Sequence, residues 1–463
     1  MGRSEKRSVT DEPKPAVLVH PYPYHDARNP VLLADVVEGL LSGGRIFLSG
    51  GAGTGKTTLV RRIANQLVQR GKRVVLAAST GIAACQLRDE TGIHNSRHCQ
   101  GPSTLHAAAF LPRVEMPDSK RRIQSGRRKL KRADVIIVDE ISMVDRITFD
   151  RFLERAEPET GLLVVGDFFQ LPPVPRNEEG LPDFAFYSTA FADFELIDLQ
   201  TVLRQAEPHF VEFLKDLRLG RVDADVLRNS HQEFDPDYPV LFGTNRQSDA
   251  HNQRRIDRID SPSVHSVCQV AKGDREEAVQ WLQSHTRAKA TLQIKQQMRV
   301  LCIQNHEDLV NGDLGTVTDI CTECAPGTEM PYWIDVEFDR NGLGTRRLNA
   351  LEFQERIWDP REDSEQVRFS VAQYPIVPAY ALTVHKAQGM TLDVVNIDGS
   401  HVNFVPGHVY VALSRARTLD GVRLRNAAGL AAFNDSAVLH YYQRAYRFQG
   451  TTGPNPGVQH ESA

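Results

Sequence analysis

Residues 50–58 read GGAGTGKTT and fit the phosphate-loop pattern G-x-x-x-x-G-K-[ST]. Glycines let the backbone curl tightly enough for successive N–H groups to point at one anion. In such a loop Lys56 reaches the β- and γ-phosphates of a nucleotide, and the Thr57 hydroxyl holds Mg²⁺. The sequence therefore predicts a nucleotide site made by Gly50, Gly51, Ala52, Gly53, Thr54, Gly55, Lys56, Thr57 and Thr58.

The residues on either side of this loop support the prediction. Residues 45–49 form a short apolar run, as expected of a strand that leads into the loop. A helical pattern follows the loop, and Gly71 ends it. A nucleotide would then place its phosphates at a helix N-terminus, where the helix dipole favours negative charge. This strand–loop–helix unit is typical of an α/β fold with a parallel sheet.

The composition is that of a globular protein. Of 463 residues, 41% are hydrophobic and 25% are charged, and the length suits about three domains. No apolar run is long enough to cross a membrane. The N-terminal residues carry charge without an apolar segment behind them, so we expect no secretory signal. Six scattered cysteines indicate reduced thiols, and together these features predict a cytoplasmic protein.

Acidic and amide side chains follow two further apolar runs. Residues 135–138 are expected to form a buried strand that ends in Asp139 and Glu140. Because the carboxyl ends of parallel strands share one edge of the sheet, both carboxylates should lie beside the phosphate loop. Asp139 would hold Mg²⁺ and Glu140 would activate the attacking water. Gln170 follows the strand at 162–165 and is placed to sense the γ-phosphate.

Two stretches leave alternatives open. Small residues after the strand at 73–78, in the run STGIAA, either open the backbone to a ligand or form a plain strand-to-helix turn. Residues 120–132 read KRRIQSGRRKLKR and contain no acid. This basic run is either a solvated face or a contact with a phosphate backbone. The net charge of −4 does not by itself announce a nucleic-acid partner.

A second α/β pattern begins near Val240, whose strand at 240–245 has its expected partner at 394–397. The interval between them has a different sequence pattern, with short runs typical of β-strands at 298–303, 315–320 and 333–338. Turns rich in Gly, Pro and Asn separate these runs. We interpret this interval as a small β-barrel inserted into the second α/β domain.

Taken in order, these motifs resemble the superfamily-one DNA helicases, and within them the Pif-one/RecD-like branch. The resemblance rests on GGAGTGKT, ASTGIAA, TLH at 104–106, DEISM at 139–143, GDFFQLPPV at 166–174, LRQ at 203–205, VNGDLG at 310–315, AYALTVHKAQG at 379–389 and YVALSRA at 410–416. It covers nearly the whole chain from about residue 31 to residue 424. GDFFQLPPV, HKAQG and YVALSR would rarely occur together otherwise.

The resemblance implies an α/β fold with two RecA-like P-loop NTPase domains and a small SH-three-like β-barrel inserted in the second. The implied division is a flexible segment at 1–28, a first motor domain at 29–200, a second at 201–293 and 373–447, the barrel at 294–372 and a flexible tail at 448–463. It further implies a monomeric ATP-dependent DNA helicase that moves five-prime to three-prime on single-stranded DNA, for repair, recombination or replication.

The resemblance also assigns residues. Lys56, Glu140 and Gln170 would act in catalysis, with Arg204 and Arg415 reaching the γ-phosphate across the cleft. An arginine in that role can be worth ~10³–10⁵ in rate. Gly389 joins the nucleotide-binding set, and ATP with Mg²⁺ at Thr57 and Asp139 is the implied cofactor. The implied contacts to single-stranded DNA and to junctions with duplex are Thr80, Thr104, His106, Thr244, Thr383, His385 and Lys386. Taken singly, each of these can equally be a helix cap or a local hydrogen bond.

The sequence departs from the family in two places. The adenine-contacting glutamine upstream of the phosphate loop is missing, and His25, Asp26 and Asn29 stand there instead. The block that eukaryotic members carry between DEISM and GDFFQ is also absent, which favours a compact bacterial or phage type. Zinc at Cys302, His306, Cys321 and Cys324 is the weaker interpretation of the single C-x-x-C, and free thiols are expected. A similar zinc site at His94, His98 and Cys99 is weaker still.

Two function classes remain open at the level of sequence. The first is a motor helicase, and the second is an ATP-switched single-strand DNA-binding module or a translocase without unwinding. Glu140, Gln170 and the two arginines favour nucleotide turnover over a static switch.

Overall fold

The structure is a computed structural model of the chain. It describes residues 26–81, 83–84, 87, 99–105, 108, 130, 132–175, 180–221, 233–309, 311–340, 342–359, 364–402, 405–426, 430 and 434–447. His25, His94, His98, His106 and nearly all of the basic run at 120–132 lie outside the described residues.

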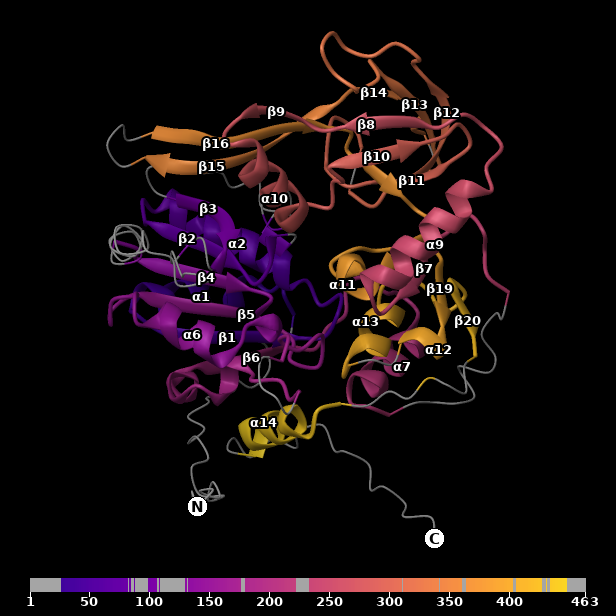
Figure 1. Ribbon diagram of the computed structural model, residues 1–463. Helices are drawn as coiled ribbons and strands as arrows, with labels where there is room; N and C mark the ends of the chain where they lie inside the picture. Colours follow the sequence, from indigo (N-terminus) through magenta and orange to yellow (C-terminus); the bar gives the residue numbers. More distant parts are fainter. Residues whose placement is uncertain are drawn as a thin grey trace, which may run out of the picture.

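A parallel sheet with strand order β3-β2-β4-β5-β1-β6 forms the centre of the first domain (Figure 1). Its strands are β1 (Arg45–Gly50), β2 (Val74–Ala78), β3 (Cys99–Thr104), β4 (Val135–Asp139), β5 (Gly161–Gly166) and β6 (Glu195–Leu199). The runs in β4 and β5 are buried along their whole length, as expected of a parallel sheet covered on both faces. This arrangement confirms the α/β class with a parallel sheet.

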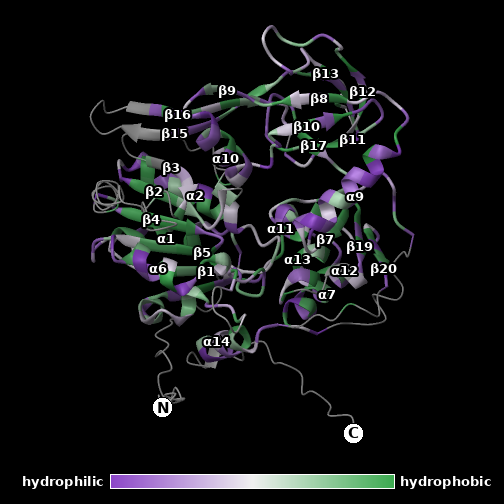
Figure 2. Cartoon of the chain, viewed as in Figure 1, coloured by the Kyte–Doolittle hydropathy of each residue, from purple (hydrophilic) through white to green (hydrophobic). Residues whose placement is uncertain are grey.

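Alternate residues of these strands face two different helix layers. Ile46, Val135 and Leu163 pack with α1 (Pro30–Leu41) and α2 (Lys56–Gln69). Phe47, Ile136 and Val164 pack on the other face. That second layer contains α6 (Arg146–Leu153) and the short helices η1 (Ile141–Met143), η2 (Ala185–Tyr187) and η3 (Thr189–Asp193). Figure 2 shows the hydrophobic residues gathered along the strands between these layers.

The last helix, α14 (Ser436–Arg447), also belongs to this second layer. Its buried residues Val438, Tyr442 and Ala445 lie in the same hydrophobic cluster as Phe47 and Phe168. Figure 1 shows α14, in yellow, beneath the first domain. The expected assignment of residues 373–447 to the second domain is therefore wrong at its end, because the aromatic face of α14 is buried against the first domain.

A second parallel sheet has the strand order β18-β7-β19-β20. As the sequence predicts, β7 (Val240–Phe242) pairs with β19 (Val395–Asp398), and β18 (Ala381–Thr383) and β20 (Val422–Arg425) flank them. Among the described residues, this domain contains the helices α7 (Pro208–Arg218), α9 (Asn245–Asp257), α11 (Val384–Ala387), α12 (Gly399–Val402) and α13 (His408–Leu413). Figure 2 shows α9 as largely hydrophilic.

Antiparallel strands fill the interval between β7 and β18. The largest sheet has the order β14-β13-β12-β11-β17, and smaller sheets pair β15-β16-β9 and β10-β8. The elements are β8 (Val264–Val267), β9 (Gln269–Lys272), α10 (Arg275–His285), β10 (Thr291–Ile294), β11 (Arg299–Cys302), β12 (Leu314–Ile320), β13 (Ile334–Phe338), β14 (Gly344–Leu348), β15 (Leu351–Asp359), β16 (Ser364–Gln373) and β17 (Ile376–Pro378). The antiparallel strands thus extend beyond the expected range of 294–372 on both sides.

This β-rich region has two hydrophobic cores. One cluster includes Val300, Val317 and Val336 of β11, β12 and β13, and residues of β10 and α9 join it. Phe353 and Phe369, by contrast, lie in one cluster with Trp281 of α10 and the core of the second parallel sheet. The β15–β16 hairpin therefore packs on α10, and through α10 its hydrophobic residues are continuous with the core of the second domain (Figure 1). No helix among the described residues is long and apolar enough to cross a membrane.

Candidate nucleotide and DNA site

The phosphate loop connects β1 to α2. Gly53 and Gly55 have φ angles of 76° and 85°, which side chains rarely adopt. A Cβ atom on Gly53 would approach the Cβ of Arg204 to 2.7 Å, and one on Gly55 would approach Leu203 to 2.9 Å. The two glycines therefore allow residues 203–204 to pack directly on the loop. Thr54 closes the turn by donating to the Gly51 carbonyl at 2.9 Å, and Thr57 and Thr58 lie in the first turn of α2.

The Lys56 ammonium is folded back onto the loop. Its Nζ donates to the carbonyls of Gly50 at 2.8 Å and Gly51 at 3.0 Å. Burial lowers the pKa of Lys56, while the carboxylates of Asp167 and Glu140 oppose that shift. The Lys56 ammonium is thus held beside the phosphate site. A phosphate there would be a stronger hydrogen-bond acceptor for it than the two neutral carbonyls.

Asp139 and Glu140 follow β4 at the carboxyl edge of the sheet. Glu140 adopts a left-handed conformation with φ 54°, and its N–H donates to Asp139 Oδ1 at 2.8 Å. Such backbone strain in a residue other than glycine is concentrated at functional sites. Burial raises the pKa of Glu140 to about 7, and the neighbouring Asp139 carboxylate acts in the same direction. A carboxylate with a pKa near neutrality suits proton transfer from water.

Gln388 connects the two domains at this point. Its Nε2 donates to Glu140 Oε2 at 3.1 Å and to Gln170 Oε1 at 3.3 Å. Gln170 is buried in the turn that follows β5, and its Nε2 lies 3.4 Å from Asp167 Oδ2. Gln388 is absent from the predicted site residues, although it stands in the quoted HKAQG motif next to Gly389.

Of the two candidate arginines, Arg415 lies close to the Glu140 carboxylate, and Arg204 lies close to Arg415. Arg415, at the end of α13, is buried, and it donates to the Val411 carbonyl at 2.9 Å and the Ser414 hydroxyl at 2.7 Å. Burial lowers the pKa of Arg415 to about 9, and the nearby Arg204 charge adds to the shift. Glu140 opposes it. The fold therefore gathers Arg204, Arg415 and Glu140 beside the phosphate loop, from opposite sides of the cleft.

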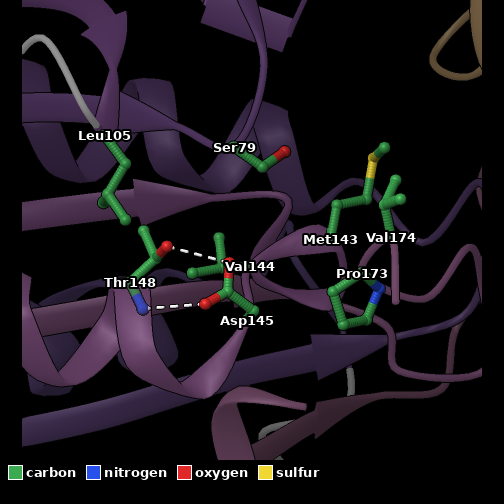
Figure 3. Close-up of a pocket in the computed structure, with 8 residues that line it drawn as sticks. All are labelled: Ser79, Leu105, Met143, Val144, Asp145, Thr148, Pro173 and Val174. Atoms are coloured by element: carbon green, nitrogen blue, oxygen red, sulfur yellow. Dashed lines mark hydrogen bonds between the residues drawn. The ribbon is translucent and has the colours of Figure 1, made fainter. Parts of the chain in front are cut away.

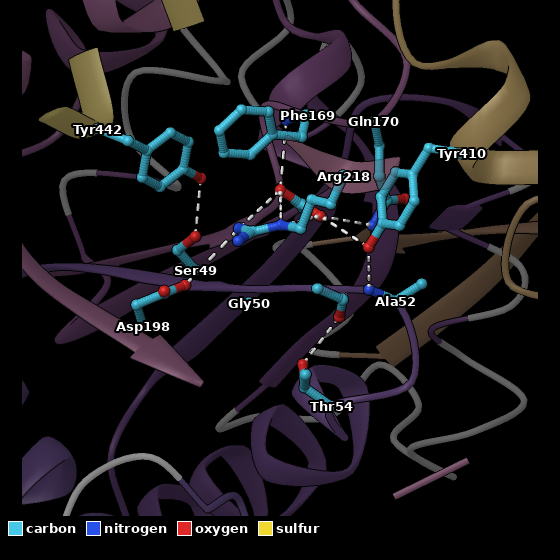
Figure 4. A network of polar contacts seen from close by, with 12 residues as sticks. Ser49, Gly50, Ala52, Thr54, Phe169, Gln170, Asp198, Arg218, Tyr410 and Tyr442 are labelled. Atoms are coloured by element: carbon cyan, nitrogen blue, oxygen red, sulfur yellow. Dashed lines mark hydrogen bonds and ion pairs between the residues drawn. The ribbon is translucent and has the colours of Figure 1, made fainter. Parts of the chain in front are cut away.

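Polar contacts that the sequence does not predict also cross the cleft (Figure 4). The Ala52 N–H of the phosphate loop donates to the Tyr410 hydroxyl at 2.7 Å. Arg218, on α7, forms a bidentate pair with Asp167, with distances of 3.0–3.1 Å. From α14, the Tyr442 hydroxyl lies 2.7 Å from Ser49 Oγ. These contacts join both domains and the last helix around the loop.

The Arg218–Asp167 pair is deeply buried. Burial acts to lower the pKa of Arg218, but Asp167 and Asp198 outweigh it and hold the pKa well above the ordinary value. The guanidinium also lies over the ring of Phe169, at 4.7 Å from its centroid. Breaking a buried pair of this kind by removing one partner typically costs about 3–5 kcal/mol.

Three of the predicted DNA contacts begin helices. The Thr80, Thr244 and Thr383 hydroxyls each accept a backbone N–H three residues ahead, at 3.1–3.3 Å. The local hydrogen bond that the sequence leaves open is therefore present at all three. Thr104 is buried at the end of β3. All four lie at carboxyl ends of parallel strands or directly after them.

His385 and Lys386 lie in the short helix α11. Burial lowers the pKa of both, and the charge of Lys289 adds to the shift at Lys386. Arg287 supports this helix, because it donates to the Lys386 carbonyl at 2.6 Å and to Asn311 Oδ1 at 2.8 Å. Sequence reasoning missed Arg287.

The end of α10 brings the β-rich region against the first domain. A Cβ atom on Gly81 would approach the His285 Cα to 2.4 Å. Gly81 directly follows Thr80, so the region contacts the first domain next to a predicted DNA contact.

The residues fit a nucleotide with Mg²⁺. The loop glycines keep their own side chains off the loop backbone, Lys56 supplies a cation, and Asp139 and Glu140 supply buried carboxylates. Gly389 follows α11 with a φ angle of 81°. Upstream of the loop, the Asn29 side chain caps α1 by accepting the Val31 N–H at 2.9 Å.

The described cysteines, Cys99, Cys268, Cys302, Cys321 and Cys324, are free thiols. Within the described part of the chain, no group of three or more histidine, cysteine or acidic residues is arranged to hold a metal ion.

Comparisons with known proteins agree with this geometry. The model of an AAA domain matches residues 34–234. The ATP-dependent DNA helicase Pif1 of Campylobacter jejuni is 30% identical over 444 residues, which cover 89% of this chain and 97% of that protein. The human ATP-dependent DNA helicase PIF1 is also 30% identical and covers 91% of this chain, but the chain spans only 65% of its length.

A solved structure shows the same architecture. The crystal structure of Pif1 helicase from Candida albicans superposes with a TM-score of 0.68 at 28% identity, over 89% of this chain and 98% of that one. With the phosphate loop, the acidic pair and the arginines gathered at one cleft, these matches lead to one conclusion: the chain belongs to the Pif1 family of ATP-dependent DNA helicases.

Proposed function

We propose that this protein is an ATP-dependent DNA helicase that moves five-prime to three-prime along single-stranded DNA and unwinds duplex. The observation that carries the proposal is the position of Gln388. It follows α11, which holds the predicted DNA contacts His385 and Lys386, and it donates to Glu140 and Gln170. A strand that displaces α11 would therefore move Gln388, which contacts the catalytic carboxylate of Glu140.

Hydrolysis follows from the residues already placed. Lys56 exchanges the two carbonyls of its loop for the phosphates, and Glu140 accepts a proton from the attacking water. Bound Mg²⁺, held by Asp139 and Thr57, would neutralise phosphate charge. Arg204 stabilises the transferring group from beside the loop and Arg415 from across the cleft, so that turnover requires the domains to close.

The β-rich region is assigned in this proposal to the inserted SH-three-like barrel. Strands β11, β12 and β13 with their separate hydrophobic cluster support that assignment. The barrel would hold the strand against the motor domains, since α10 and Arg287 lie between it and the predicted contacts Thr80 and Lys386. We propose that the active species is a monomer.

Two assays test the proposal together. ATP hydrolysis should rise strongly when single-stranded DNA is added, and a duplex with a five-prime tail should be displaced while a three-prime tail is not. Lys56→Ala and Glu140→Gln serve as controls that retain DNA binding without turnover. Slow hydrolysis that DNA does not stimulate, with no displacement of either substrate, would instead support an ATP-switched binding module.

A further inference from the structure

A small pocket lies in the first domain, away from the phosphate loop (Figure 3). Its volume is about 150 Å³. Its lining comes from the segments that follow four neighbouring strands of one parallel sheet and from the start of α6. The lining residues are Ser79 after β2, Leu105 after β3, Met143 and Val144 after β4, Pro173 and Val174 after β5, and Asp145 and Thr148 at the start of α6. The phosphate loop follows β1, further along the same sheet.

The chemistry of the lining is mostly apolar. Asp145 and Thr148 satisfy each other, because the Thr148 N–H and hydroxyl donate to the two Asp145 carboxylate oxygens at 2.9 and 2.8 Å. Ser79 differs. Its hydroxyl oxygen is buried and has no hydrogen-bond partner among the described residues. Figure 3 shows this hydroxyl directed toward the space between Ser79 and Met143. A buried hydroxyl without a partner is unfavourable, and a ligand with a polar edge would relieve it.

The position of the pocket indicates what enters it. Thr80 and Thr104, both predicted to contact the DNA strand, are the direct neighbours of Ser79 and Leu105 in the chain. At the pocket's rim Val174 is 75% exposed, an apolar side chain on the same edge of the sheet. A strand whose backbone passes Thr80 and Thr104 would carry its bases past this opening.

We propose that the pocket accepts one base of the bound single strand. The inference rests on the proposed function, because the occupant is part of the helicase substrate. The volume is below the roughly 300–1,000 Å³ of pockets for drug-sized ligands, which suits one ring system. Alkyl walls contact the face of any base, and the Ser79 hydroxyl reaches a base edge, so the site tolerates any sequence. A base held here sets the register of the strand on the first domain.

The test uses a scan of single abasic sites through a short single-stranded oligonucleotide bound by the full chain. Removing one particular base should weaken binding roughly five- to tenfold, the lower range for one base contact, while neighbouring positions matter less than about twofold. In Val174→Glu this position dependence should disappear. Ile147→Glu is the matched control, because Ile147 is 43% exposed beside Thr148, does not line the pocket, and receives the same charge.

Ser79→Ala provides a second variant that separates binding from folding. Because the hydroxyl has no partner among the described residues, its removal should leave the melting temperature unchanged or slightly raised. Affinity for the intact oligonucleotide should fall about two- to tenfold, the size of one hydrogen bond.

The outcomes divide clearly. If the abasic scan is flat in the parental protein, or keeps its one sensitive position in Val174→Glu, the pocket does not hold a base, and the proposed helicase activity stands. The abasic scan could instead be flat while a partner protein with an apolar contact surface binds the parental chain but not Val174→Glu. That result would assign the pocket to a side chain of the partner protein. Failure of the parental protein to bind single-stranded DNA would overturn both proposals.

Discussion

The hydroxyl of Tyr410, in the first turn of the second domain's α13, accepts the backbone N–H of Ala52 in the phosphate loop at 2.7 Å. It also lies 3.4 Å from Asp167, which Arg218 holds in place. Backbone N–H groups of this loop are the donors that a bound phosphate uses. In the structure, therefore, a side chain of one domain satisfies a phosphate donor of the other.

Replacing Tyr410 by Phe should show whether the Tyr410 hydroxyl and a bound phosphate use the same Ala52 N–H donor. The variant keeps the packing but leaves the Ala52 N–H without its partner, which costs about 1–3 kcal/mol in the free protein. A phosphate should relieve that cost, so a non-hydrolysable ATP analogue should raise the melting temperature more in the variant than in the parental chain. Tyr441→Phe is the matched control, because the buried Tyr441 hydroxyl has no partner within the described structure. An equal shift in all three proteins would contradict the interpretation.

Gln388→Ala should uncouple DNA from hydrolysis. The contacts from Gln388 to Glu140 and Gln170 cross the cleft, while Lys56 and Asp139 keep the nucleotide site without them. We expect basal ATPase to change by less than about threefold, and the factor of DNA stimulation to fall at least about tenfold. The measurement is the ATPase rate against DNA concentration. A loss of basal and stimulated rates by the same factor would show that Gln388 acts in the chemical step alone.

Arg415→Ala and Arg204→Ala should each lower the ATPase rate by about 10³-fold or more, with single-strand affinity nearly unchanged. Because both charges act at one cleft, the double variant should lose less than the product of the two single losses. Single-turnover hydrolysis of the four proteins gives this comparison. Fully multiplicative losses would assign the two arginines to separate roles.

Removing one partner of the Arg218–Asp167 pair should destabilise the fold. Arg218→Met leaves the Asp167 carboxylate buried without its bidentate partner, and we expect the free energy of unfolding to fall by about 3–5 kcal/mol. Adding Asp167→Asn to Arg218→Met should recover part of that loss, since the uncompensated charge is then gone. Denaturant unfolding measures both. Equal stability of the single and double variants would show that the pair contributes little.

Local elements could be predicted from the sequence because their signals are local. The glycines and Lys56 of the phosphate loop and the strand that ends in Asp139 each depend on a few adjacent residues. The pairing of β7 with β19 is also confirmed, since both are apolar runs of the second α/β pattern. β3 and β6 carry weaker patterns and were not predicted.

The sequence by itself determined the class of fold, the nucleotide loop and the order of the motifs, because each of these depends on residues close together in the chain. Only the tertiary structure decided which distant residues complete the site. Ala52 and Tyr410 are 358 positions apart, Glu140 and Gln388 are 248 apart, and Ser49 and Tyr442 are 393 apart. Neither periodicity nor spacing predicts such pairs. They arise because the two domains and α14 pack around the phosphate loop and bury these polar groups together. A buried polar group needs a hydrogen-bond partner, and here the partner comes from a distant part of the chain.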